Sequence, residues 1–259
     1  MGNTKNMKLV CIVVLSILLC KNSKAQLAII NDSDGYTNVR EVGSMTSKIT
    51  GRIFLGDIFL YVQVDTNKQW TAISYSPDLE TLEQSKKDYY FNVLHWNNKK
   101  LHIQGYIHNS RLIPISTLKC ILKDSIHRNF TKNKLTIKND SIELIVVISP
   151  FKIGDHQIEK DKNGFVKKID GSLPKGIDGE IPKVQIDSVN LIVNKEKIVI
   201  PTKYYKDLYE PRINSLNIYF DDKQNIYLYM PDNSDGAANY SVAWLFKKGQ
   251  FVKRYVDSF

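Results

Sequence analysis

The sequence predicts an all-β protein made of two modules, and three observations support this fold class. Short runs rich in Val, Ile, Tyr and Phe recur along the chain, separated by Gly, Asn, Asp and Pro. Such runs between turn-forming residues are typical of β-strands. Helical spacing of apolar residues is scarce, and 259 residues are enough for one or two domains. We therefore expect a small β-barrel followed by a β-sandwich-like module.

Residues 1–25 have the pattern of a secretory signal peptide. Lys5 and Lys8 precede an apolar run from Leu9 to Cys20, and the small residues Ser23 and Ala25 stand before a cleavage site. The apolar run is shorter than the roughly 20 residues of a membrane-spanning helix. We therefore expect cleavage near Ala25 and a periplasmic or secreted protein.

The cysteines bear on membrane attachment and on disulfide bonding. The alternative to a cleaved signal is a lipoprotein anchored through Cys20, although Leu19 stands where such signals have a small residue. Cys11 and Cys20 leave with a cleaved signal, so Cys120 is the single cysteine of the mature chain and no internal disulfide can form. Its apolar neighbours at 118–122 predict a buried structural thiol.

The charge argues against a nucleic-acid partner. Cleavage after Ala25 removes four lysines and no acidic residue, which lowers the formal charge from +9 to +5. The remaining basic residues come as scattered pairs such as Lys99-Lys100 and Lys247-Lys248. A soluble surface accounts for this pattern better than a nucleic-acid-binding face does.

The first half of the mature chain contains the strands of a five-stranded barrel. The expected strand segments are 34–41, 51–57, 58–64, 70–73 and 105–112. Residues 76–87 interrupt this series with a helical pattern, in which Ser76 is an N-cap and Pro77 suits the first helical position. Leu79 and Leu82 share one face of this helix. We interpret it as a short helical insertion between two barrel strands.

The first and last of these segments resemble the opening and closing strands of a bacterial SH3 (SH3b) domain. They read Asp34-Gly35-Tyr36-Thr37-Asn38-Val39-Arg40-Glu41 and Gly105-Tyr106-Ile107-His108-Asn109-Ser110-Arg111-Leu112. The resemblance implies an SH3-like β-barrel that binds a peptide or cell-wall ligand and carries no chemistry itself. Because the two segments bracket a complete barrel, we expect residues 27–117 to fold alone.

The resemblance also implies a ligand-binding cleft in this module. The residues that it places around the cleft are Tyr36, Asn38, Trp70, Tyr106 and His108. Partly exposed aromatic side chains there can stack on a peptide or sugar. The alternative for Trp70 and Tyr106 is burial in the barrel core, where we also expect Val39.

Residues 119–259 predict the β-sandwich-like module. The expected strands are 135–137, 142–148, 189–193, 197–200, 216–220, 226–230, 240–246 and 250–256. Segment 142–148 is apolar on both faces in its second half, as in a central strand, whereas 226–230 alternates like a strand with one core face. Residues 154–180 are rich in Gly, Lys and Asp and predict a long loop or mobile hairpin. Segments 225–237 and 244–256 resemble the C-terminal region of exported bacterial SH3b proteins, which implies architecture and no activity.

No catalytic site is predicted. Cys120 lacks the Asp-Cys-Ser-Gly setting of the cell-wall peptidases that are often fused to SH3b domains, and His127 and His156 merely follow it along the chain. His102 and His108 share strand parity, with His95 nearby, but no zinc signature accompanies them. We expect no metal and no other cofactor at these residues.

Calcium is a weaker alternative at residues 159–170. Glu159, Asp161, Asn163 and Asp170 stand at the ligand positions of an EF-hand loop, with Gly164 at its glycine position. The flanks cannot form helices, and nearby lysines oppose a cation. A hairpin turn at 161–164 is the preferred interpretation.

These observations predict a non-enzymatic exported protein that recognises a peptide, a cell-wall fragment or a protein partner. The alternative is an immunity or inhibitor protein directed against an exported toxin or hydrolase. A more distant alternative is a hydrolase whose site follows no familiar pattern. Association with a membrane is expected only if Cys20 is lipidated.

Overall fold

The computed structural model describes residues 26–62, 69–77, 102–121, 127–233 and 238–258. These residues are all-β: antiparallel strands joined by turns, with short 3-10 turns and no α-helix among them. The predicted signal peptide and most of the helix predicted at 76–87 lie outside the described residues. None of the described segments forms a helix long and apolar enough to cross a membrane.

The strands that precede Lys119 form one seven-stranded sheet in the order β3-β2-β6-β5-β4-β1-β7. Their bounds are β1 (Gln26–Ile30), β2 (Tyr36–Arg40), β3 (Ile49–Phe54), β4 (Phe59–Tyr61), β5 (Trp70–Tyr75), β6 (Ile103–His108) and β7 (Leu112–Pro114). All seven strands contribute to one buried cluster, but the edge strands β3 and β7 do not pair, so the described strands form no closed barrel. Val39 is fully buried in this cluster, as predicted. The sheet has more strands than the five expected, because β1 and β7 pair with each other beside β4.

Gly105 has a steric role where the two SH3b-like segments meet. Strand β6 pairs with β2 through Tyr106 and Arg40. A Cβ atom on Gly105 would collide with the backbone oxygen of Arg40 and press on the side chain of Val39. Only glycine therefore permits this close approach of the two strands.

The second half of the chain forms two five-stranded antiparallel sheets. One has the order β15-β14-β11-β10-β9 and the other β19-β18-β17-β16-β8. Their bounds are β8 (Lys119–Cys120), β9 (His127–Phe130), β10 (Lys134–Lys138), β11 (Ile142–Pro150), β14 (Val184–Val193), β15 (Glu196–Ile198), β16 (Asn217–Phe220), β17 (Ile226–Met230), β18 (Tyr240–Lys247) and β19 (Gln250–Ser258). The largest hydrophobic cluster joins the two sheets, with Leu144 and Leu191 on one side and Leu228 and Trp244 on the other. Short 3-10 turns lie at Asn109–Arg111, Ile115–Thr117, Ile153–Asp155, Thr202–Tyr204 and Ile213–Ser215.

Two predicted burial patterns are wrong. Strand β17 is buried on both faces, not one, because Tyr227 and Tyr229 face a second cluster on the far side of their sheet. Strand β11 is central in its sheet but buried on one face only, since Ile145 and Val147 are half-exposed. The sheet that contains β17, not the one that contains β11, is therefore the middle layer of the molecule.

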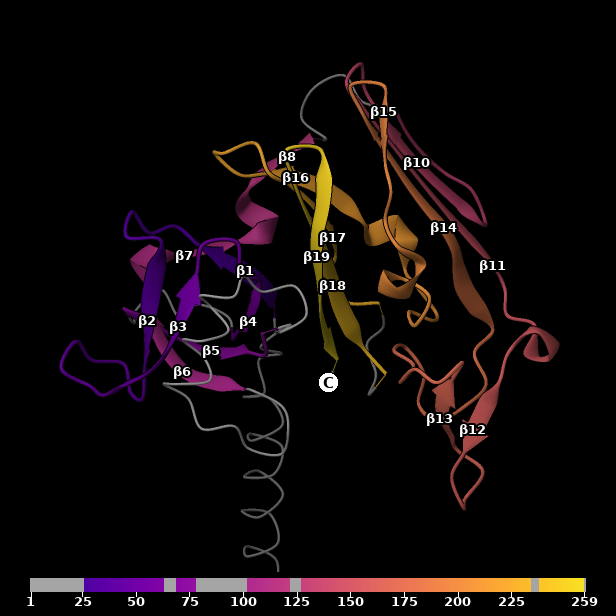
Figure 1. Cartoon of the computed structure of the whole chain (residues 1–259), viewed down its shortest axis with the longest axis horizontal. Helices are drawn as coiled ribbons and strands as arrows, with labels where there is room; N and C mark the ends of the chain where they lie inside the picture. The colour runs from indigo at the N-terminus through magenta and orange to yellow at the C-terminus, as the bar shows by residue number, and fades with distance from the viewer. Residues whose placement is uncertain (1–25, 63–68, 78–101, 122–126, 234–237, 259) are drawn as a thin grey trace, which may run out of the picture.

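The second cluster joins the two halves of the chain, and we call it the inter-module cluster. Its buried members are Leu27, Ile29, Ile58, Ile115, Tyr219, Tyr227, Tyr229, Ala243 and Leu245. The first four precede Lys119, and the others belong to β16, β17 and β18. Cys120 is half-buried against this cluster and is not the fully buried thiol that its neighbours predict. In Figure 1 the sheet of β17–β19 accordingly stands between β1–β7 and the sheet of β10, β11 and β14.

Residues 154–180 follow the second of their two predictions, a hairpin rather than a long loop. They contain a hairpin of β12 (Ile158–Lys160) and β13 (Val166–Ile169), which projects at the lower right of Figure 1. Val166 and Ile169 pack with Tyr209 in a small cluster of their own. Local sequence pattern did not predict this anchor, because Tyr209 lies far along the chain.

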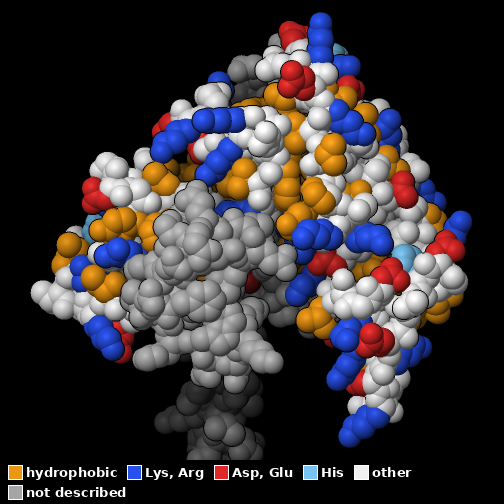
Figure 2. Space-filling model, viewed as in Figure 1, with side chains coloured by type: hydrophobic (Ala, Val, Ile, Leu, Met, Phe, Trp, Pro, Cys, Tyr) orange, Lys and Arg blue, Asp and Glu red, His pale blue; other side chains and the backbone are white. Residues whose placement is uncertain are grey.

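The surface has mixed charge on the face shown in Figure 2. Lys and Arg side chains are spread over this face among acidic and apolar ones. Their arrangement matches the scattered basic pairs of the sequence and forms no continuous basic patch on the part of this face that the structure describes.

Candidate functional site

A groove of about 170 Å³ lies on the N-terminal module, where the predicted ligand-binding residues converge. It is lined by Asp32, Asp34, Tyr36, Thr37, Asn38, Arg40, Met45, Trp70, His108 and Arg111. Four of the five predicted residues, namely Tyr36, Asn38, Trp70 and His108, are among them. They come from β2, β5 and β6, which the sheet order brings side by side as β2-β6-β5.

Trp70 and His108 form the aromatic wall of the groove. They are directly opposite each other on β5 and β6, and their rings meet edge to face with centroids 5.3 Å apart. The Nδ1 atom of His108 accepts the backbone N–H of Ser110 at 3.3 Å and lies 2.8 Å from its hydroxyl oxygen. These contacts cap the 3-10 turn at Asn109–Arg111 and fix the orientation of the imidazole.

Tyr36 and Asn38 are held from β3. The guanidinium carbon of Arg52 lies 4.3 Å from the centroid of the Tyr36 ring, a cation–π contact. The Nε of Arg52 also donates to Oδ1 of Asn38 at 3.3 Å. Arg52 pairs with Asn38 across the β2–β3 ladder, so both contacts follow from strand register. One residue therefore positions two predicted contact residues.

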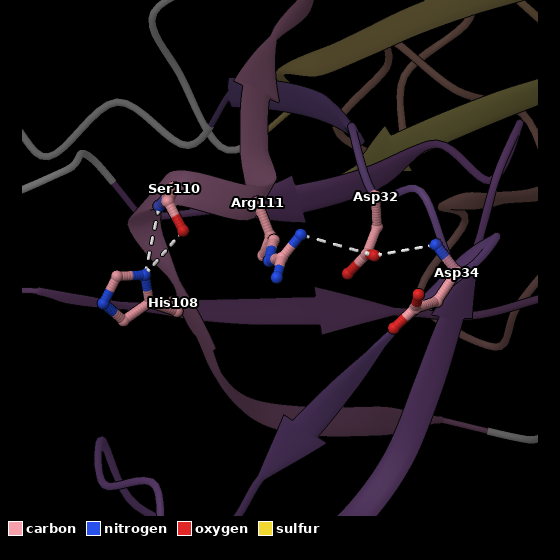
Figure 3. A network of polar contacts seen from close by, with 5 residues as sticks. All are labelled: Asp32, Asp34, His108, Ser110 and Arg111. Atoms are coloured by element: carbon pink, nitrogen blue, oxygen red, sulfur yellow. Dashed lines mark hydrogen bonds and ion pairs between the residues drawn. The ribbon is translucent and has the colours of Figure 1, made fainter.

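Asp32, Asp34 and Arg111, which line the groove, form a network of polar contacts (Figure 3). Asp32 is 7% exposed, and its Oδ1 accepts the backbone N–H of Asp34 at 3.1 Å and lies 3.4 Å from Nη1 of Arg111. The backbone N–H of Gly35 donates to the Asp32 carbonyl at 3.1 Å, so residues 32–35 form a turn. Arg111 and Asp34 are exposed, so the network presents both a cation and a carboxylate to the groove.

Sequence reasoning missed the charged residues of the groove. Asp32, Arg40 and Arg111 lie in or directly beside the two SH3b-like segments, so position along the chain could have indicated them. The N–H of Arg40 Nη1 donates to the carbonyl of Ser47 at 2.6 Å, which ties the loop at 41–48 to the groove. Met45 from that loop completes the lining.

Tyr106 lies outside this groove. It faces the same side of the sheet as Trp70, opposite Ala72, and borders a separate shallow depression with Val62 and Gln104. Its side chain is 37% exposed and Trp70 is half-buried. Neither residue is buried in the core of the sheet, so the alternative of core burial is wrong.

The oxygen atoms of the candidate calcium loop have separate partners. Oδ1 of Asp161 accepts the N–H groups of Asn163 and Phe165, as in a hairpin turn, while Glu159 pairs with Lys168 at 3.1 Å. Asp170 instead contacts His156 at 2.8 Å. Among the described residues, no group of three His, Cys, Asp or Glu side chains could hold a metal ion.

The two described histidines of the zinc hypothesis also lie apart. His102 precedes β6 and contacts the hydroxyl oxygens of Ser74 and Ser76 at 3.4 and 2.9 Å, whereas His108 ends the strand. His95, the third candidate, lies outside the described residues. Only His108 therefore belongs to β6, and the two histidines have different partners.

The contact between His156 and Asp170 predicts a pH-dependent contribution to stability. The hydrogen bond from His156, followed by that from the backbone N–H of Gln157, lowers the pKa of Asp170 below its ordinary value. A carboxylate with a lowered folded-state pKa stabilises the fold above its unfolded pKa and loses this effect as pH falls through the folded pKa. Asp170→Asn should therefore be less stable than the wild type at pH 7, and the difference should shrink below about pH 4.

Urea unfolding of both proteins at pH 7 and at pH 3 measures this difference. Asn is a suitable replacement because residue 170 has φ +50°, a conformation that Asn tolerates. A constant difference at the two pH values would show that Asp170 acts through packing rather than through its charge.

Comparison with known proteins leaves the groove as the basis for any functional argument. No family model, no curated protein and no solved structure gives a significant match to this chain. The function is therefore inferred from the side chains that line the groove.

Proposed function

We propose that the chain is a non-enzymatic, exported binding protein that recognises a peptide or cell-wall fragment in the groove of an SH3b-like N-terminal module. The C-terminal residues would form a sandwich-like module that supports it. The supporting observation is the convergence of Tyr36, Asn38, Trp70 and His108 at one groove, although Tyr36 and Trp70 lie in strands that are not neighbours.

The groove has the chemistry that a peptide ligand requires. The Tyr36 and Trp70 rings offer apolar faces for stacking. Arg40 and Arg111 offer guanidinium donors to a carboxylate, and Asp34 offers an acceptor to an amine. Several of these groups are already oriented by contacts within the module, which lowers the entropy cost of binding.

The histidine of the groove fits binding better than catalysis. A hydrolase needs a nucleophile with a base positioned to activate it. The Ser110 hydroxyl does approach Nδ1 of His108, but the same nitrogen accepts the Ser110 backbone N–H and caps a turn. This local arrangement explains the contact without a catalytic role.

Truncation of the groove aromatics tests the proposal. Tyr36→Ala should weaken retention on purified insoluble peptidoglycan by roughly 2- to 10-fold, since aromatic stacking contributes about 0.5–1.5 kcal/mol beyond buried area. Its effect on thermal stability should be small, because Tyr36 is only partly buried. Trp70→Ala should reduce both retention and stability, because Trp70 packs against His108 and against the backbone at Gly43.

Cosedimentation with peptidoglycan and a thermal melt of each variant provide the two measurements. Phe130→Ala is the matched control, because Phe130 is an aromatic residue 50% exposed on β9, in the C-terminal module. Equal retention of wild type, Tyr36→Ala and Trp70→Ala would contradict binding through this groove.

A second candidate function, inhibition of an exported protein, has its own supporting observation. Val42 and Met45 are 55% and 70% exposed in the loop beside the groove. Exposed apolar side chains that cluster next to a groove are typical of protein–protein contact sites. Retention of one stoichiometric protein partner, with no retention on peptidoglycan, would favour this function.

A further inference from the structure

A second cavity lies between the two modules, away from the groove. It has a volume of about 360 Å³ and is bordered by β1 and β7 on one side and by the β16–β17 turn on the other. Small-molecule sites are commonly of this size and often lie between domains. We call this cavity the inter-module cleft.

The floor of the inter-module cleft is apolar and comes from both modules. Ile29 and Ile113 contribute from adjacent positions on β1 and β7, and Leu118 from the segment that follows. Tyr227 contributes from β17, where it is 1% exposed. The same four residues belong to or pack against the inter-module cluster, so the floor is part of a rigid interface.

Three lysines line the cleft: Lys119, Lys223 and Lys247. The ammonium group of Lys247 lies against the backbone of Gly56, whose missing Cβ leaves the space that this group occupies. Gly56 has φ +85°, so an alanine there would be strained as well as crowded. The ammonium group of Lys247, from β18, thus lies beside the turn at Gly56 that precedes β4.

The acidic residues of the cleft offset these cations only in part. Oδ1 of Asp221 accepts the N–H groups of Lys223 and Asn225, and its Oδ2 accepts the side chains of Asn225 and Tyr227. Both of its oxygens are therefore engaged in forming the β16–β17 turn. Asp222 is exposed beside it, so the described lining of the cleft holds three lysines and two aspartates.

We propose that the inter-module cleft binds a small amphiphilic carboxylate. The apolar chain of such a ligand would lie on the floor formed by Ile29, Ile113 and Leu118, and its carboxylate would lie at the lysines. The apolar floor favours the hydrocarbon chain of the ligand, and the lysines favour its carboxylate. Because residues of both modules form the site, a bound ligand would also stabilise the junction between them.

Octanoate is the probe that tests this proposal in the full mature chain. Thermal unfolding should show a midpoint that rises with octanoate concentration, whereas 1-octanol and inorganic phosphate should have much smaller effects at equal concentration. The double variant Lys119→Gln/Lys247→Gln should bind octanoate roughly tenfold more weakly, because it loses two cationic donors.

The control is Lys134→Gln/Lys197→Gln, which removes the same charge from two exposed lysines of the other five-stranded sheet. It should keep the octanoate affinity of the wild type. Methyl resonances of Ile113 and Leu118 should shift on titration with octanoate, which locates the ligand independently of stability.

Several results would overturn the proposal. The absence of any octanoate-dependent shift in the midpoint and in the methyl resonances would exclude the site. Equal stabilisation by octanol would exclude recognition of the carboxylate, and equal stabilisation by phosphate would exclude the apolar contribution. Equal loss of affinity in both double variants would mean that net charge, not the cleft lysines, attracts the ligand.

Discussion

Lys253→Met is expected to lower the free energy of unfolding by about 3–5 kcal/mol, the cost of removing one partner from a buried ion pair. The Nζ of Lys253 on β19 lies 2.8 Å from Oδ1 of Asp57. Asp57 is completely buried, and the Lys253 side chain is 12% exposed. Without the ammonium group, the buried carboxylate would lose an ion pair that offsets its lost hydration.

The second variant of this test separates charge from packing. The other oxygen of Asp57 accepts the backbone N–H of Phe54 at 2.9 Å, a contact that Asn can retain. Asp57→Asn/Lys253→Met should therefore recover much of the stability lost by Lys253→Met alone, since no buried charge remains. The coupling energy is the change in unfolding free energy of the double variant minus the sum of the changes in the two single variants.

Urea unfolding of the two single variants and the double variant measures this coupling. Lys197→Met is the control for the loss of a lysine, because Lys197 is exposed on β15. A cost below about 1 kcal/mol for Lys253→Met would place the pair among weak surface ion pairs. If the double variant is as unstable as Lys253→Met alone, the loss of stability comes from altered packing and not from the unpaired charge.

The sequence predicted those parts of the fold that depend on local pattern. Alternation of apolar residues located most strands, and the two SH3b-like segments located Val39 in the core and four groove residues on one surface. Neighbouring residues largely determine such features, because strand formation and turn chemistry act over a few positions.

The remaining features depend on contacts between distant segments, which local pattern does not contain. Tyr227 and Tyr229 looked like an exposed face because their partners, Leu27 and Ile29, stand about 200 positions earlier in the sequence. The hairpin at 154–180 was one of two predictions, but its anchor was not predicted because Tyr209 stands far along the sequence. The ion pair of Asp32 with Arg111 likewise forms only after β1 and β7 pair, although the positions of both residues in or beside the SH3b-like segments could have indicated them as groove residues.

Residues 27–117 expressed alone are expected to be far less stable than the same residues in the full chain. The sequence predicts that they fold alone, and the structure shows what that folding would have to overcome. Leu27, Ile29, Ile58 and Ile115 are at most 4% exposed and pack against the C-terminal module. Their exposure would cost on the order of 6–12 kcal/mol as an upper estimate, at about 1.5–3 kcal/mol for each side chain.

This cost is comparable with the total stability of a typical domain, about 5–15 kcal/mol. The core that the seven strands share would remain, so the isolated module should keep part of its strand content. Its circular dichroism melt should be broad or shifted far below that of the full chain. Its amides in β1 and β4 should lose exchange protection first, because these strands carry or adjoin the uncovered side chains.

Amide exchange on the fragment and on the full chain, measured for the same residues, tests this expectation. Protection in β2 and β6 serves as the internal control, since these strands lie away from the inter-module cluster. Equal protection throughout the fragment and the full chain would mean that the cluster adds little stability and that the N-terminal module is independent. Selective loss in β1 and β4 would instead mean that the groove is supported by the C-terminal module, because the turn at Asp32 that shapes the groove directly follows β1.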